Sequence, residues 1–283
     1  MSYNVILEET IMQKDIPATA GSKMLESFIS PIDATVVTRL KDTDMKIVGR
    51  YAFSEFGISG LFRDYQDNEL AKALENADVM LCNDFTGAIA KAAKSCGMYY
   101  IQPKYGTVSR YGLIPSVCSL DQIGVLCKDL DIGQKVLEII SGHDLKDGIM
   151  NPDEMKVCHS GDSPEFPRHC GLDPQSPTTE VIIQGIPVPL SETLQVRNDK
   201  NLQKQIKQII CCAEFMGNMS RYDGVKYGYR AKDYKDLTEM YTKSRTEAFG
   251  EDVKLAILIG AMVLSSENYD RYYDKARKLI IND

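Results

Sequence analysis

Residues 78–103 read DVMLCNDFTGAIAKAAKSCGMYYIQP and combine the signals of a strand, a helix and a second strand. The apolar run at 78–81 predicts a short strand, and the alanine-rich segment 87–96 predicts a helix that Gly97 closes. Residues 98–101 predict another strand, which Pro103 stops. Strand and helix in alternation with short links are typical of a layered α/β protein.

The flanking segments continue this alternation. Helical spacing at 34–40 follows Asp33, which we expect to be the N-cap. Residues 46–48 predict a strand, and 68–76 and 131–140 predict further helices. The first half of the chain is therefore expected to form an α/β sheet structure.

The composition changes between residues 151 and 189, a segment that contains seven prolines. Clustered proline and turn residues predict a long loop or linker, with one strand at 181–186. The C-terminal third is predicted to be helical because its apolar residues recur at spacings of three and four. The expected helices cover 201–216, 232–249 and 251–279.

Composition bounds the function. Of the 283 residues 43% are hydrophobic, enough for a substantial core, and the net charge is -7. An acidic chain is a poor stand-alone nucleic-acid binder, because phosphate contacts need excess Lys and Arg on one face. The net charge does not exclude a local basic patch. Any contact with tRNA is expected to be shared with a partner protein.

The chain carries no recognisable export or membrane signal. Its first residues lack a basic segment followed by a long apolar run. The longest apolar run, 255–264, is interrupted by Gly260, is too short to span a membrane and predicts a buried helix. We therefore expect a cytoplasmic protein whose eight cysteines are reduced thiols.

Three ordered blocks carry a resemblance to a known family. The central block is PKYGTVSRYGL at 103–113, continued by SLDQIG at 119–124 and ISGHD at 140–144. The second is RYDGVKYGYR at 221–230, followed by FGEDVK at 249–254. The third runs from GSKML at 21–25 through DATVV at 33–37 to IVG at 47–49. On these residues the chain is identified as a member of the amidase-signature family.

The 221–230 block resembles in particular the A-type component of glutamyl-tRNA(Gln) and aspartyl-tRNA(Asn) amidotransferases. The resemblance implies an abbreviated amidase-signature fold, of α/β class, with a mixed central sheet flanked by helices. It implies a shortened core at 1–150, a Pro-rich insert or linker at 151–189, and a helical part of the same domain at 190–283. It also implies protein partners of the B and C subunit type, with tRNA bound only indirectly.

The family's chemistry, as the resemblance implies it, uses two serines and a lysine. One Ser attacks an amide carbon, the second relays its proton to a neutral Lys, and backbone N–H groups hold the oxyanion. A hydroxyl is a weak nucleophile until a base takes its proton. A Lys can be that base only when its surroundings lower its pKa. The N–H donors must point at the developing negative oxygen.

In this chain all three catalytic positions are substituted. Anchored matches put Glu8 at the position of the lysine and Ala88 at that of the nucleophile. A gapless count puts Asp64 at the position of the relay serine, whose Gly-Ser loop is replaced by the helical sequence 68–76. A methyl group cannot attack a carbonyl, and a carboxyl in place of an amine reverses the charge. No intact catalytic set is therefore predicted.

The surrounding site is altered as well. The remnant oxyanion turn keeps Gly87 but carries Phe85 and Thr86 in place of small residues, and Phe85 is expected to crowd it. Leu255 and Ala256 stand where the family has a pair of arginines. An anionic substrate would lose a bidentate partner there. The tyrosine of the family's pocket is retained as Tyr227.

Three hypotheses of function follow. The first is a catalytically inactive relative that binds partners or has a structural role. The second is a divergent amidotransferase or amidase component that hydrolyses glutamine to supply ammonia for Gln-tRNA(Gln) or Asn-tRNA(Asn), with Thr86 as the nearest replacement hydroxyl. The third is a decaying gene product. The substitutions favour the first or third over the second.

No cofactor and no metal site are expected. Cys158-His159 and His169-Cys170 together carry two Cys and two His, the residue types of a tetrahedral zinc site. Adjacent ligands rarely point at one ion, and their spacing matches no zinc motif that we recognise. We therefore predict that they do not bind metal and belong to a foreign insert in the linker.

Overall fold

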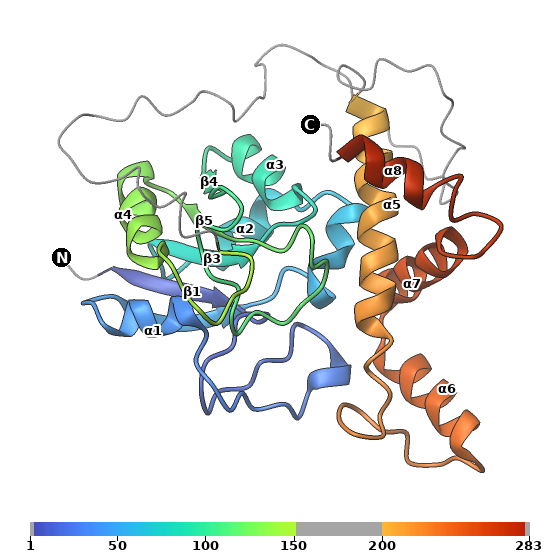
Figure 1. Cartoon of the computed structure of the whole chain (residues 1–283). Helices are drawn as coiled ribbons and strands as arrows, with labels where there is room; N and C mark the ends of the chain where they lie inside the picture. Colours follow the sequence, from blue (N-terminus) through green and yellow to red (C-terminus); the bar gives the residue numbers. More distant parts are fainter. Residues whose placement is uncertain (1–2, 151–199, 281–283) are drawn as a thin grey trace.

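The computed structural model describes residues 3–150 and 200–280, and its sheet is mixed (Figure 1). The sheet order is β2-β1-β3-β5-β4. Strand β1 runs parallel to β2 and β3, whereas β5 runs antiparallel to β3 and β4. The α/β class and the mixed sheet are as expected. The strand bounds are β1 Asn4–Glu8, β2 Lys46–Tyr51, β3 Val79–Asn83, β4 Tyr99–Ile101 and β5 Ile123–Cys127.

Helices cover both faces of the sheet because successive strand residues point to opposite sides. Val5 and Leu7 pack with α1 (Thr35–Lys41) and α4 (Leu130–Ile140). Ile6 and Met80 pack with α2 (Asp67–Ala73) and α3 (Ala88–Ser95) on the other face. The flanking helices confirm that part of the expectation.

A helical layer lies beside this sheet. In Figure 1 the long helix α5 passes alongside it, with α8 and α7 packed along α5 and α6 below its lower end. Gly260 of α7 permits close helix packing, because a Cβ atom there would overlap the carbonyl oxygen of Cys212 on α5. The bounds are α5 Lys200–Met219, α6 Leu237–Ala248, α7 Glu251–Val263 and α8 Tyr273–Ile280, with the 3-10 helices η1 Lys23–Leu25 and η2 Glu55–Leu61.

Two helix predictions at the C-terminal end were wrong in extent. The predicted helix 251–279 is two helices, because the side chains of Ser265 and Asn268 bond the carbonyl of Met262 and stop α7. The predicted helix 232–249 begins only at Leu237, where the Asp236 side chain accepts a bond from Glu239 N as the N-cap.

The predicted cap of α1 was also wrong. Ala34, not Asp33, is the N-cap. The Asp33 carboxylate instead accepts a bond from Lys14 N and pairs with Lys41 at 2.7 Å.

The segment 255–264, predicted to be a buried helix, is helical but not wholly buried, since Leu258 is 68% exposed. No helix within 3–150 and 200–280 is long and apolar enough to span a bilayer. The predicted strand at 181–186 lies outside the described residues.

Candidate functional site

Two of the three predicted catalytic positions, Glu8 and Ala88, lie near the carboxyl ends of β1 and β3. The parallel register pairs Leu7 with Leu81, so Glu8 at the end of β1 lies beside the end of β3. The chain leaves β3 at Asn83, turns through 84–87 and enters α3 at Ala88. This is the edge of an α/β sheet at which ligands ordinarily bind.

Glu8 is an acid buried without a cationic partner. The residue is only 2% exposed to solvent. Its Oε2 atom accepts hydrogen bonds from Asn83 N (2.7 Å) and Thr10 Oγ1 (2.9 Å). Burial raises the pKa of Glu8 to about 7, against the two hydrogen bonds and with help from the nearby carboxylates of Asp84 and Asp121. Among the described residues no basic side chain pairs with it.

Asn83 links Glu8 to a second buried acid. Its Nδ2 donates to Asp121 Oδ1 at 2.8 Å, and its Oδ1 accepts from Gln122 N at 3.0 Å. Asp121 also accepts bonds from the backbone N–H groups of Ser116 and Val117. Burial raises the pKa of Asp121, and these bonds oppose the shift. The network holds the β1, β3 and β5 ends in one fixed arrangement.

The turn at residues 84–87, predicted from the sequence to be a remnant oxyanion turn, is occupied by its own side chains. Asp84 Oδ2 accepts a bond from Ala90 N at 2.8 Å, so this carboxylate caps the first turn of α3. Thr86 Oγ1 donates to Asp84 Oδ1 and accepts from Ala88 N at 3.2 Å. Gly87 adopts φ +80°, which favours glycine. Two backbone N–H groups at the start of α3, those of Ala88 and Ala90, thus donate to the side chains of Thr86 and Asp84.

Phe85 points into the protein core and not across the turn. It is 2% exposed and belongs to the core of the helical layer. A Cβ atom on Gly57 would lie 3.2 Å from its ring. The ring therefore packs under η2, the segment that stands before the turn.

The main chain of Gly60 fills the space in front of Ala88. A Cβ atom on Gly60 would overlap Thr86 Oγ1 and lie 2.7 Å from Ala88 Cβ. Real side-chain contacts are not this short, so no side chain larger than hydrogen fits at position 60 without a shift of its neighbours. The Ala88 methyl group therefore lies against the main chain of η2 at Gly60.

Asp64 lies on the outer side of α3. Its side chain is 60% exposed and pairs with Lys91 at 2.6 Å. It makes no hydrogen bond to Glu8, Thr86 or any other described residue of the turn. The structure thus brings Glu8 and Ala88 to one place and leaves Asp64 at the surface.

An amine that the sequence motifs do not reveal lies at the turn. Lys207, on α5, places its Nζ 3.4 Å from where a Cβ atom on Gly87 would be. Burial raises the pKa of Asp84, and the charge of Lys207 and hydrogen bonds from the start of α3 oppose that shift. The only hint in sequence is a Lys beside Ile206, Ile209 and Ile210 on a helix that buries them.

Three further predicted positions lie in the C-terminal part of the chain. Tyr227 is 46% exposed in the connection between α5 and α6, and its ring meets that of Tyr222 edge-on at 5.8 Å. Ala256 is fully buried in α7, whereas Leu255 is 38% exposed. Tyr227 is therefore a surface residue in this structure.

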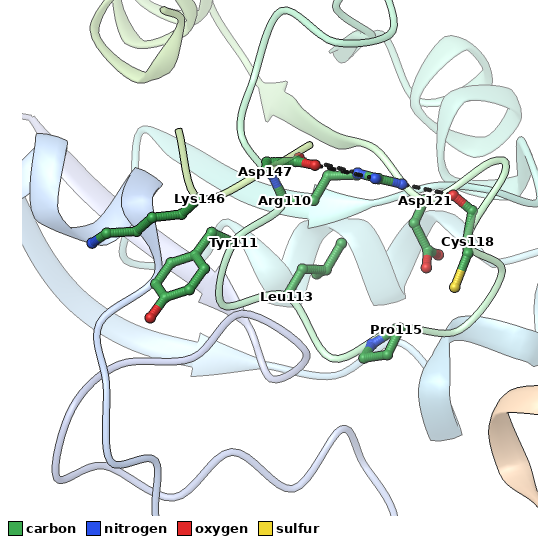
Figure 2. A pocket seen from close by; sticks show the side chains of 8 residues that line it. All are labelled: Arg110, Tyr111, Leu113, Pro115, Cys118, Asp121, Lys146 and Asp147. Atoms are coloured by element: carbon green, nitrogen blue, oxygen red, sulfur yellow. Dashed lines mark hydrogen bonds and ion pairs between the residues drawn. The ribbon is translucent and has the colours of Figure 1, made fainter. Parts of the chain in front are cut away.

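A small pocket adjoins the buried network at Asp121 (Figure 2). Its volume is about 190 Å³, and Asp121 is the one member that it shares with the network. Figure 2 shows Arg110 spanning the pocket between Asp147 (3.2 Å) and the carbonyl of Cys118 (2.6 Å). The lining residues are Arg110, Tyr111, Leu113, Pro115, Cys118, Asp121, Lys146 and Asp147. None of the sequence-predicted site residues lines it.

No metal-binding cluster of three or more His, Cys, Asp or Glu residues occurs within the described parts of the chain. Six cysteines in those parts are free thiols. Cys158-His159 and His169-Cys170 lie outside the described residues.

Comparison with known proteins adds the family. The amidase family model matches residues 5–61, 71–164 and 192–282. It leaves out 62–70, which contains Asp64, and 165–191. The glutamyl-tRNA(Gln) amidotransferase A subunit of Persephonella marina is 33% identical over 97% of this chain and 63% of its own length. That of Caldanaerobacter subterraneus subsp. tengcongensis is 35% identical over 99% and 64%. The chain thus spans less than two thirds of these relatives.

Solved structures agree on the fold. The structure of the corresponding amidotransferase component from Thermotoga maritima has a TM-score of 0.52 at 21% identity, covering 98% of this chain and 62% of its own. The peptide amidase of Stenotrophomonas maltophilia has a TM-score of 0.60 at 18% identity, covering 98% and 64%. From the matched blocks, the family model and the fold together, the chain belongs to the amidase family.

Proposed function

We propose that this chain is a catalytically inactive member of its family that acts as a partner-binding or structural protein. The observation that carries the proposal is the approach of Gly60 to Ala88 and Thr86. Catalysis by this family's chemistry needs a hydroxyl with open space before it and a base beside it. Here a methyl group faces protein backbone, and the base position holds the buried acid Glu8.

The partners that we propose are proteins of the amidotransferase B and C subunit type, with tRNA reached only through them. The similarity to the A-type component of these enzymes supports this choice. Co-expression with B- and C-type subunits, followed by affinity purification, tests it. A stable stoichiometric complex supports the proposal, whereas a lone insoluble chain under the same conditions favours a decaying gene product.

A second candidate, a divergent glutamine-hydrolysing component, is favoured by one observation. The turn holds a hydroxyl, Thr86, and an amine, Lys207, close to the same glycine. Against it, Thr86 Oγ1 already donates to Asp84 and accepts from Ala88 N, and no hydrogen bond joins Thr86 to Lys207. The hypothesis of an inactive protein therefore has the stronger support.

Glutaminase assay of the purified chain, alone and with added B- and C-type subunits, separates these candidates. We expect no ammonia release above that of a boiled sample. Thr86→Ala and Lys207→Met serve as matched variants and are expected to change nothing. Ammonia release that either variant abolishes would establish the second candidate and overturn the first.

Restoring the family's residues is not expected to restore catalysis. In Glu8→Lys/Ala88→Ser, the new serine would still face Gly60, without room for a substrate carbonyl. Burial, the largest cause of the raised pKa of Glu8, would lower the pKa of a lysine at this position, whereas the carboxylates of Asp84 and Asp121 would raise it. The expectation therefore rests on the lack of space before residue 88. Detectable glutamine hydrolysis by this double variant would show that the site is more open than its contacts imply.

A further inference from the structure

The connection between α5 and α6 is rich in basic residues, although the protein as a whole is acidic. The α5–α6 connection (residues 220–236) and the start of α6 follow the lower end of α5, away from the sheet (Figure 1). Residues 221–245 hold seven basic and four acidic residues, although the whole chain has a net charge of -7. Such a local reversal of charge selects for an anionic partner.

Three of the four acidic side chains of this segment make internal bonds, and the fourth, that of Asp233, is exposed. Asp223 Oδ1 accepts from the N–H groups of Val225 and Lys226, which fixes the turn. Asp236 is the N-cap of α6. Glu239 accepts from Lys235 N and pairs with Lys243. Their negative charge is thus held next to backbone N–H groups or a cation.

Four exposed basic side chains of this segment lack carboxylate partners among the described residues. Lys226, Lys232 and Lys235 are exposed, and none of them makes an ion pair with a described residue. Arg230 bonds only the carbonyls of Gly224 and Val225, and its residue is exposed too. Four positive charges therefore face solvent from one short segment.

Exposed aromatic rings alternate with these cations. Tyr227 follows Lys226 and is 46% exposed, and Tyr234 precedes Lys235 and is 43% exposed. Neither phenol hydroxyl makes a hydrogen bond with a described residue. A surface tyrosine without a polar partner offers a ring face for stacking.

Both halves of the connection are fastened to one residue of α6. Ser244 Oγ accepts a bond from Ala231 N at 3.0 Å. It also lies against Gly224, where a Cβ atom would be 3.1 Å from it. Ser244 is fully buried, so cations and rings are carried by a compact loop held in a fixed shape. A preformed surface loses little conformational entropy on binding.

We propose that the α5–α6 connection binds single-stranded nucleic acid. Lysine ammonium groups contact successive phosphates while tyrosine rings stack on unpaired bases, the combination by which proteins bind single strands without reading their sequence. A double helix hides the base faces, and a polyanion of carboxylates alone, such as polyglutamate, offers no flat rings, so neither uses both features. The inference goes beyond the proposed function and does not rest on it.

Fluorescence anisotropy of the full chain with a labelled single-stranded RNA or DNA of about 12 nucleotides tests this proposal. Lys226→Glu/Lys232→Glu/Lys235→Glu is expected to weaken binding at least about tenfold at about 50 mM salt, and to flatten the salt slope by about 2. The matched control is Lys46→Glu/Lys94→Glu/Lys135→Glu, three exposed lysines elsewhere. It changes the net charge equally and is expected to alter affinity less than about twofold.

Tyrosine variants test the stacking part. Tyr234→Ala and Tyr227→Ala are each expected to weaken binding about five- to tenfold, with the salt slope unchanged. The proposal is overturned if no oligonucleotide binds at low salt, or if the control triple variant loses as much affinity as the test one. It is also overturned if a duplex, polyglutamate or an anionic vesicle binds through the same lysines at least as tightly as the single strand.

Discussion

Glu8→Gln is expected to stabilise the protein at pH 8. The folded-state pKa of Glu8 is about 7, against 4.5 for an ordinary glutamate, because ionising it means charging a buried group. A shift of this size corresponds to about 3 kcal/mol of lost stability once the group is ionised in both states. Glutamine keeps an oxygen that can accept from Asn83 N and Thr10 Oγ1 and carries no charge.

The sign of the pH dependence follows from the same shift. Below pH 4.5 Glu8 is protonated in both states, and the variant and the natural chain should be equally stable. As the pH rises from 4.5 to about 7, the unfolded chain loses this proton first, so the natural chain loses stability over that window. Above it the difference is constant. Asp84 and Asp121, whose pKa values burial also raises, act in the same direction.

Urea unfolding of both chains between pH 4 and pH 8, followed by circular dichroism, measures the difference. The matched control is Glu75→Gln, which removes the same charge from an exposed residue and is expected to change stability by less than about 0.5 kcal/mol at any pH. A Glu8→Gln effect that does not vary with pH, or a loss of stability at pH 8, would contradict the buried-acid description.

The sequence predicts the α/β half of the fold well where its strands and helices have local signals. The stretch 78–103 gives β3, α3 and β4 nearly at their observed bounds, because glycine and proline mark their ends. Strands β1 and β5 were not assigned. Val5, Ile6 and Leu7 are all buried, so this strand shows no alternation, and all five residues of β5 are buried too.

The site is predictable only as far as its motifs are local. Glu8 and Ala88 can be placed because matched residues flank them, and they do meet at one sheet edge. The path of η2 cannot be read in this way. It depends on Phe56 at φ +50° and Gly57 at φ +72°, and a left-handed phenylalanine has no sequence signal. Lys207 reaches the turn from α5, far along the chain, through tertiary packing alone.

Gly60→Ala is expected to destabilise the protein by about 1 to 3 kcal/mol, the usual cost of forcing a methyl group into a packed site. The new Cβ atom would meet Thr86 Oγ1 and Ala88 Cβ at distances that real contacts do not show. Thermal and urea unfolding of the variant measure this loss. In the double variant Gly60→Ala/Thr86→Ala the nearest clashing atom is gone, so part of the loss, about 1 kcal/mol, should be recovered as a coupling energy.

Gly217→Ala is the matched control, because a Cβ atom on Gly217 in α5 meets nothing within 4 Å. It is expected to be neutral or to stabilise the helix by up to about 1 kcal/mol. The comparison of Gly60→Ala with Gly217→Ala also tests whether the space before Ala88 is filled. If Gly60→Ala proved as harmless as Gly217→Ala, the space before Ala88 would be open, and a substrate could approach the turn. The proposal of an inactive site would then lose its main support, since a filled site and a harmless added methyl cannot both hold.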